Sequence, residues 1–315
     1  MHALQHNMAT DDVSGEKLNV EMVKAARMLE MEFFTKMGVY TRVTRASALA
    51  SGKGRIIQGR WIDVNKGDSS VPDYRSRYVG KEFNRGQAAT ADLYAATPPL
   101  EALKLLISSA ASDTTRDTHL MLSDVKRAYF HAPATRELYV ELPAEDPGHA
   151  QGMVGKLNLS LYGTRDAAAN WQRCVTEHLR GIGFQQGRSN PCVFYHKARN
   201  LRTLVHGDDY ASAGRLADLE WLKQQLETRF DMKTKLVGHS GRQGVDREAR
   251  ILNRVVRVTK EGWEYECDQR HVEIILEQLE LQNAKSLTTP GVEDSTTPVE
   301  EGDELPLTGD LASLF

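Results

Sequence analysis

Three aspartates have the placement that best suits catalysis. Asp124 follows the apolar run 120–122, which predicts a buried strand, and Asp208 and Asp209 lie together at a turn between two short apolar runs. A bare Asp-Asp pair is more commonly a solvated turn, but a strand end and a turn can also meet at one edge of a sheet. Adjacent carboxylates repel each other, and a divalent cation is the usual partner that keeps both ionised. We therefore predict that the three acids bind two Mg²⁺ ions, with Mn²⁺ as an alternative, in a centre for nucleotidyl transfer.

The elements that must position these acids follow from the apolar spacing. The first expected helix ends before Gly38 and has an apolar stripe on one face, formed by Met22, Ala26, Leu29, Phe33 and Met37. Further helices are expected near residues 97–110, 166–181, 215–230 and 269–281, and strands at 120–125, 193–196, 204–206 and 210–213. This interleaving predicts an α+β fold with helices packed on one face of an antiparallel sheet.

Composition excludes several classes of protein. The 315 residues are 40% hydrophobic and 26% charged, which is ordinary for a folded protein with a real core. Because no apolar stretch approaches the roughly 20 residues of a membrane span and the N-terminus has no hydrophobic signal core, we expect a soluble, unexported chain. Cys174, Cys192 and Cys267 are odd in number and lack paired spacing, so we expect buried thiols rather than disulfides or zinc ligands.

Charge is unevenly distributed along a chain whose net charge is −3. Between Lys233 and Lys260 there are eight basic residues and two acids, whereas residues 293–304 contain six acids and no base. A local basic patch can follow a phosphate backbone even when the whole protein is near neutral, although such a segment can equally be a solvated face. The acidic stretch, with prolines around it, is typical of a linker.

Several motifs around the acids resemble one family. In chain order they are DYRSRYVGKEF at 73–83, SDVKRAYFHAP at 123–133, KLNLSLYGTRDAAANW at 156–171, GFQQGRSNPCVFY at 183–195 and VHGDDY at 205–210. Together they are similar to the reverse transcriptase of copia-type long-terminal-repeat retrotransposons, the RNA-directed DNA polymerase domain of a Pol polyprotein. The chain departs from the family at His206 and Gly207, where Tyr-Val usually precedes the paired acids.

The resemblance implies a right-hand polymerase fold, with fingers, palm and thumb, whose antiparallel palm sheet carries the acids. It implies that Arg75 and Arg77, which alternate along an extended segment and so share one face, bind the triphosphate. Tyr129 and its neighbour Phe130 follow Asp124, where an aromatic ring would exclude a 2′-hydroxyl and select deoxynucleotides over the ribonucleotides used by viral RNA polymerases. The alternatives are solvated charge for the arginines and core packing for the aromatic ring.

Three further residues gain candidate roles from the same resemblance. Gly163 would let the backbone approach the template–primer closely, and Arg165 lies nearby to meet phosphate. Lys233 is a candidate general acid for the leaving pyrophosphate.

Domain organisation and partners are likewise expectations. Residues 1–18 lack periodicity and are expected to be disordered, residues 19–290 to form the reverse transcriptase domain, and residues 291–315 to be an acidic linker toward an RNase H domain that this chain lacks. The implied partners are template RNA or DNA with a primer and the deoxynucleoside triphosphates, with no membrane, in a cytoplasmic particle or the nucleus. Without RNase H and integrase, the chain is expected to be a fragment of a Pol polyprotein. The alternative is a catalytically decayed or domesticated nucleic-acid-binding remnant.

Overall fold

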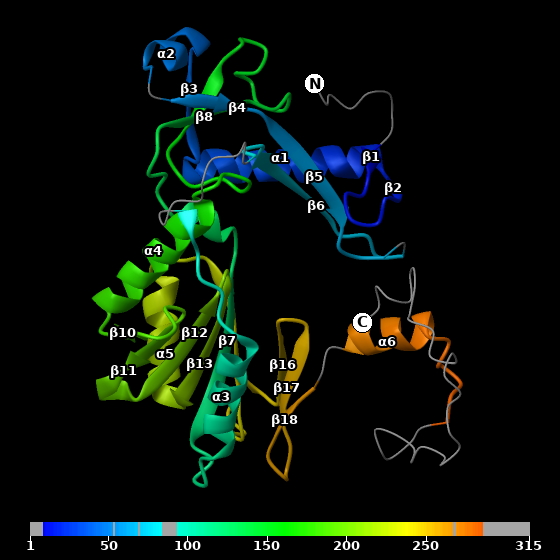
Figure 1. Ribbon diagram of the computed structural model, residues 1–315, viewed down its shortest axis with the longest axis vertical. Helices are drawn as coiled ribbons and strands as arrows, with labels where there is room; N and C mark the ends of the chain where they lie inside the picture. The colour runs from blue at the N-terminus through cyan, green and yellow to red at the C-terminus, as the bar shows by residue number, and fades with distance from the viewer. Residues whose placement is uncertain (1–8, 53, 69, 84–92, 267–268, 286–315) are drawn as a thin grey trace, which may run out of the picture.

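The chain folds into an upper part, built mainly from N-terminal elements, and a lower part around one large sheet (Figure 1). This computed structural model describes residues 9–285 apart from 53, 69, 84–92 and 267–268. Residues 1–8, Cys267 and the expected acidic linker at 291–315 therefore lie outside the described residues. Within the described residues, no helix is long and apolar enough to cross a membrane.

The lower part is a seven-stranded sheet that confirms the four strands expected from the sequence. The strands lie in the order β10 (Gln185–Gln186), β11 (Val193–His196), β12 (Leu201–His206), β13 (Asp209–Arg215), β7 (Thr118–Val125), β14 (Met232–Val237) and β15 (Val245–Asp246). All neighbours are antiparallel except β14 and β15. The α+β class and the antiparallel sheet are therefore as expected.

Helices cover both faces of this sheet, not one face as the sequence predicted. Alternate residues of a strand point to opposite faces, so Met121 joins the core under α4 (Ala167–Gly181) and α5 (Leu216–Glu227). Leu120 and Leu122 instead pack with α3 (Leu100–Ala111). The sheet interior is apolar on both faces, which accounts for the unbroken run Leu120–Leu122 in the sequence.

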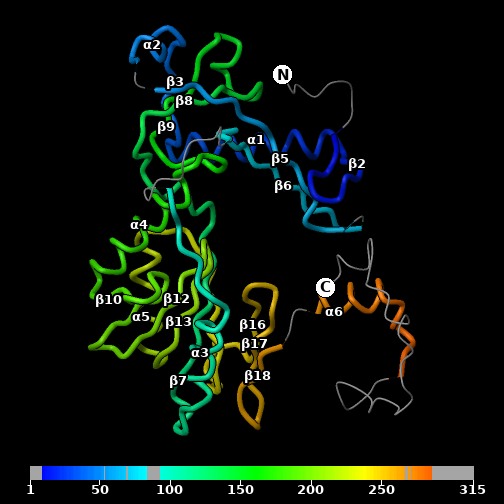
Figure 2. Tube along the Cα trace, viewed as in Figure 1, coloured from blue at the N-terminus to red at the C-terminus, as the bar shows by residue number. Residues whose placement is uncertain are grey.

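The upper part joins a four-stranded sheet to a long hairpin. The sheet has the order β3 (Tyr40–Val43), β9 (Val154–Leu157), β8 (Leu138–Glu141) and β4 (Arg55–Ile57), with α2 (Arg45–Ala50) beside it. The hairpin pairs β5 (Gly59–Asn65) with β6 (Tyr74–Gly80), and α1 (Val20–Met37) packs across β6. After β7 the chain returns to the upper part for β8 and β9, then descends again at α4 (Figure 2). The two parts are therefore joined by several chain crossings.

Helix α1 forms as the sequence predicts, but it buries a different face. Asn19 caps its start by accepting the Glu21 and Met22 N–H groups, and Gly38 ends it with φ +67°. The buried residues are Val23, Arg27, Glu30, Met31 and Phe34. Met22 and Leu29 of the expected stripe are exposed. The reason is that Arg27 and Glu30 turn inward, where Arg27 pairs with the buried Asp63 and Glu30 with the partly buried Arg127.

The expected disorder of residues 1–18 is wrong for residues 9–18, which form a small hairpin. Its strands are β1 (Ala9–Thr10) and β2 (Lys17–Leu18). In the turn region, Asp11 accepts the Asn65 N–H at 2.7 Å and Asp12 accepts the Asp63 N–H at 2.8 Å. These two acids satisfy backbone donors along the edge of β5, which explains how a segment without apolar periodicity becomes ordered.

A smaller sheet and a helix follow the palm-like sheet. The strands β16 (Glu248–Ile251), β17 (Arg254–Val258) and β18 (Trp263–Tyr265) form an antiparallel sheet whose buried residues join the α3 core. The last described helix is α6 (Gln269–Gln278), close to its expected place. Cys174 and Cys192 are buried thiols, as expected.

Candidate active site

The three aspartates meet at one end of two central strands of the large sheet, β7 and β13. Asp124 on β7 and Asp209 on β13 are directly paired in register, so their Cβ atoms lie roughly 4.5–5.5 Å apart on one face. Asp208 lies in the preceding turn, and its carbonyl accepts the Val125 N–H at 3.0 Å. A strand end and a turn that are far apart in sequence therefore come together as the spacing predicted.

Electrostatics shows that the acids act on one another. Partial burial, and then the charges of Asp208 and Asp124, raise the pKa of Asp209 to about 6. Burial and Asp208 also raise the pKa of Asp124, while Lys233, Arg77 and Lys126 oppose that rise. Lys233 is paired in register with Asp124 from the other side, on β14. The acids therefore form a cluster that gains from added positive charge.

The donor set suits a hard divalent cation. Carboxylate oxygens are the ligands that Mg²⁺ prefers, and a cation would relieve the repulsion that raises these pKa values. Among the described residues, no group of three or more His, Cys, Asp or Glu side chains is arranged to hold a metal ion as it stands. The carboxylate chemistry of the three acids therefore fits a divalent cation.

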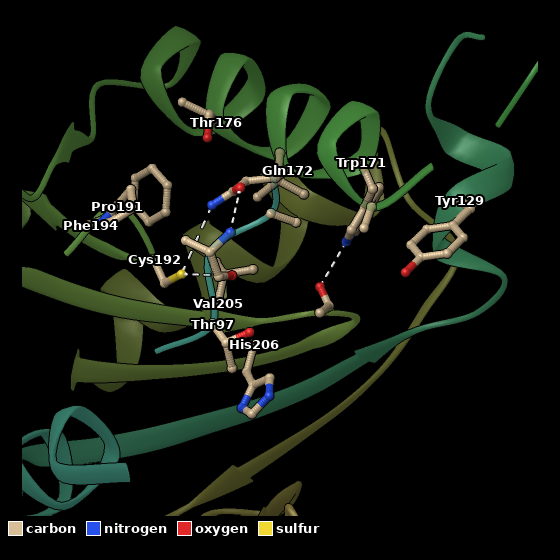
Figure 3. Close-up of a pocket in the computed structure, with 15 residues that line it drawn as sticks. Thr97, Tyr129, Trp171, Gln172, Thr176, Pro191, Cys192, Phe194, Val205 and His206 are labelled. Atoms are coloured by element: carbon tan, nitrogen blue, oxygen red, sulfur yellow. Dashed lines mark hydrogen bonds between the residues drawn. The ribbon is translucent and has the colours of Figure 1, made fainter. Parts of the chain in front are cut away.

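The turn that holds the paired acids is stabilised by a side-chain hydrogen bond from α4. Gly207 has φ +62°, a conformation that favours glycine, and its carbonyl accepts the Trp171 indole N–H at 2.7 Å (Figure 3). His206 pairs with Asp209 across the turn and is half-buried beside a cavity of about 330 Å³. The His206-Gly207 departure is therefore accommodated by a closed, hydrogen-bonded turn. The sequence pointed to Trp171 as a motif residue but not to this contact.

Two tyrosines and an arginine form a column beside the acids. The rings of Tyr129 and Tyr162 have centroids 4.5 Å apart, and the Arg77 guanidinium lies 4.9 Å from the Tyr162 ring centroid. Burial and then the charge of Asp208 raise the pKa of Tyr129. Burial, opposed by Arg77 and aided by Asp208, raises the pKa of Tyr162 to about 12. Sequence reasoning missed Tyr162, although the SLYG motif contains it.

Of the remaining residues expected to bind the nucleotide, some lie near the three acids and others lie away from them. Arg75 and Arg77 share one face of β6 as predicted, and both flank the buried Ser76. Arg77 is among the charges that lower the pKa of Asp124, and Arg75 is exposed two residues before it on β6. Phe130 is 1% exposed and packs at 4.9 Å from Phe34 in the upper core. The structure therefore brings Arg77 to the acids and leaves Phe130 in the protein interior.

Gly163 is needed where the SLYG loop meets the hairpin. Its φ is +81°, and a Cβ there would lie 2.0 Å from the Gly80 carbonyl oxygen. Gly80 donates its N–H to the Tyr162 carbonyl at 2.7 Å, and Arg165 donates its backbone N–H to Glu82 at 2.9 Å. The close approach seen at Gly163 is to the β6 backbone, whereas the sequence predicted an approach to the template–primer.

Parts of the basic segment are neutralised within the protein. Arg257 forms ion pairs with Glu248, Glu264 and Glu266. Arg250, in contrast, is exposed on β16. Positive charge in the sequence therefore overstates the charge that this surface offers to phosphate.

The large sheet thus carries three carboxylates at the ends of two central strands, with an arginine-bearing hairpin from the upper part beside them. The model of the reverse transcriptase (RNA-dependent DNA polymerase) family matches residues 48–293, and the chain belongs to this family. Its large sheet is the palm of a right-hand polymerase fold, and the upper sheet and hairpin are the fingers.

Two curated relatives confirm the resemblance to copia-type elements. The chain is 27% identical over 270 residues to the retrovirus-related Pol polyprotein from transposon TNT 1-94 of Nicotiana tabacum, covering 83% of this chain and 19% of that protein. It is 24% identical over 189 residues to the transposon Ty1-BL Gag-Pol polyprotein of Saccharomyces cerevisiae, covering 59% of this chain and 10% of that protein. The chain therefore spans a fifth or less of these relatives.

Among solved structures, the foamy viral protease–reverse transcriptase in complex with double-stranded DNA is similar, with a TM-score of 0.43 and 14% identity. The match covers 86% of this chain and 40% of that chain.

Proposed function

We propose that this chain is an RNA-directed DNA polymerase that adds deoxynucleotides to a primer 3′-hydroxyl on an RNA or DNA template. The observation that carries the proposal is the register pair Asp124–Asp209 with Asp208 in the adjoining turn, in a chain that belongs to the reverse transcriptase family. This arrangement supplies three carboxylates at the point where the fingers and the palm meet.

Asp124, Asp208 and Asp209 are proposed to hold two Mg²⁺ ions, with Mn²⁺ as a substitute. Divalent ions bound there supply the positive charge that favours ionisation of the primer hydroxyl and stabilises the leaving pyrophosphate. The protein's own contribution is to hold the backbone of the turn that carries the paired acids, through the Val125–Asp208 and Trp171–Gly207 hydrogen bonds. Lys233, which is paired in register with Asp124, is proposed to give a proton to the pyrophosphate.

Arg77 is proposed to bind the triphosphate, with Arg75 further along the same face of β6. Its guanidinium can direct several N–H groups at phosphate oxygens, and its stacking on Tyr162 fixes the plane of the fork. Tyr129 is proposed to exclude the 2′-hydroxyl, and Tyr162 supports its ring. Phe130 contributes by packing behind this layer, and Gly163 and Arg165 by joining the SLYG loop to the fingers.

The partners follow from this assignment. They are the template–primer duplex and the four deoxynucleoside triphosphates. Both relatives are Pol polyproteins much longer than this chain, which covers 19% and 10% of their lengths.

Primer extension tests the proposal. Purified protein is incubated with an RNA template, a DNA primer, Mg²⁺ and deoxynucleoside triphosphates, and Asp208→Asn is compared with the wild type. Loss of one ligand should lower the rate by about 10²–10³ or more, since the substitution removes charge but little volume. Asp73→Asn, an exposed aspartate before β6, is the matched control and should extend normally. Equal extension by Asp208→Asn and the wild type would refute the assignment.

A further inference from the structure

Glu30 on α1 is a buried carboxylate with two arginine partners from different parts of the chain. Its side chain is 2% exposed. Arg127, just after β7, donates from Nε to one carboxylate oxygen at 2.9 Å, and Arg77 on β6 places Nη1 3.6 Å from the other oxygen. Burying a carboxylate is costly unless it is paired, so these two contacts explain how Glu30 is kept in the interior.

The contact with Arg127 fixes the element that carries Tyr129. Arg127 has φ +51°, which is uncommon for a residue with a side chain, and its guanidinium lies 3.5 Å from the Phe33 ring centroid. Its carbonyl accepts the Phe130 N–H at 2.9 Å, within the 3₁₀ helix η2 (Ala128–His131). Glu30 and Phe33 are one turn apart on α1 and together clamp Arg127. The start of η2 is therefore set by α1.

The contact with Arg77 is only half made. At 3.6 Å, the Arg77 Nη1 and Glu30 Oε1 atoms attract each other but are too far apart for a hydrogen bond. Within the described part of the chain, neither atom has a hydrogen-bond partner. Arg77 is thus oriented by the Glu30 carboxylate and by the Tyr162 ring.

We propose that Glu30 is a positioning residue that sets Arg77 and Arg127 together and so couples triphosphate binding to sugar selection. The inference rests on the proposed function and deepens it. Glu30 itself touches neither the phosphates nor the sugar. Removing its charge should therefore disturb two separate subsites at once, which an ordinary structural residue would not do.

Equilibrium binding tests this coupling without requiring turnover. A template–primer whose primer ends in a dideoxynucleotide is bound to the full chain with Mg²⁺, and the Kd values of thymidine triphosphate and its ribo counterpart are measured. Glu30→Gln should raise the Kd of the deoxynucleotide roughly tenfold. It should also lower the ratio of the ribonucleotide Kd to the deoxynucleotide Kd several-fold. Glu32→Gln, an exposed acid on the same helix, is the matched control and should change neither value.

Two further variants test triphosphate binding and sugar selection separately. Arg77→Lys should raise both Kd values equally, because both nucleotides carry the same triphosphate. Arg127→Lys should narrow the ratio and affect the deoxynucleotide less. If Glu30→Gln is too unstable to purify, Glu30→Asp keeps the charge on a shorter arm and should shift both readouts in the same directions.

Several results would overturn the inference. A folded Glu30→Gln, or in its place Glu30→Asp, with both Kd values within about twofold of the wild type would show that Glu30 only supports folding. A change in the deoxynucleotide Kd with an unchanged ratio would remove the coupling. A wild type that binds the triphosphate but extends no ordinary primer would refute the proposed function alone, and the Kd comparison would still decide the role of Glu30.

Discussion

The contact between Gly163 and Gly80 makes a sharp prediction about stability, because a single added methyl group has nowhere to go. In Gly163→Ala the new Cβ would lie 2.0 Å from the Gly80 carbonyl oxygen and 3.1 Å from its carbonyl carbon. Both sides of this contact are backbone, held by the Gly80–Tyr162 hydrogen bond of 2.7 Å. Either the SLYG loop or the end of β6 must therefore move.

The size of the effect follows from two contributions. An alanine at φ +81° costs about 1–2 kcal/mol, partly offset by about 0.4–1 kcal/mol from the stiffer unfolded chain. Displacing the packed backbone adds about 1–3 kcal/mol. Gly152→Ala is the matched control, because Gly152 also has positive φ, +66°, but nothing within 4 Å of the added Cβ. It bears only the first contribution.

Thermal and urea unfolding, followed by circular dichroism, measure the difference. Gly163→Ala should be about 1–3 kcal/mol less stable than Gly152→Ala, or roughly 2–10 °C lower in Tm. It should also weaken triphosphate binding, because the same contact places β6 and Arg77. Equal losses in the two variants would show that backbone conformation alone, and not the contact with Gly80, accounts for the glycine.

Three other outcomes follow from the site. Burial and neighbouring acids raise the pKa of Asp209 to about 6, so the free energy of unfolding falls as pH rises from about 4 toward 6. Asp209→Asn should remove this loss and be about 1–2 kcal/mol more stable than the wild type above pH 6, after allowance for solvent screening. Urea titrations at a series of pH values should show that this advantage vanishes near pH 4. Tyr129→Ala should raise kcat/KM for ribonucleotides relative to deoxynucleotides, while Tyr129→Phe should keep the wild-type ratio because the ring excludes the 2′-hydroxyl. An unchanged ratio in the alanine variant would show that Tyr129 serves only in core packing. Arg250→Ala should flatten the salt dependence of template–primer affinity by up to about 0.9 in the log–log slope, and Arg257→Ala, whose charge is already paired, should flatten it less.

The spacing of apolar residues in the sequence was sufficient to predict most helices and strands of the palm. Apolar spacing placed α4 and α5 to within a few residues, and the short run at Val193–His196 matches β11. The two acids at the turn were predicted to meet Asp124 because a strand end and a turn can come together at one edge of a sheet. These elements are decided by neighbours close in sequence, which is where periodicity carries information.

Long-range ionic contacts account for what the sequence did not reveal. The predicted buried face of α1 was wrong because Arg27 and Glu30 turn inward, toward Asp63 on β5 and Arg127 after β7. Nothing near Glu30 in the sequence indicates that its partner lies 97 positions away. The Tyr129–Tyr162 stack was missed for the same reason, since the two rings come from separate motifs.

The place of β7 in the palm sheet also bears on how the chain is made. Both neighbours of β7 lie downstream of it, in β13, which begins at Asp209, and in β14, which ends at Val237. At a synthesis rate of about 5–20 residues per second, β7 waits roughly 5–20 s for both partners. Throughout that interval an apolar strand has two open edges, a state prone to aggregation and a natural substrate for chaperones. Asp124 and the paired acids Asp208 and Asp209 thus become neighbours only late in folding, after most of the chain between them has left the ribosome.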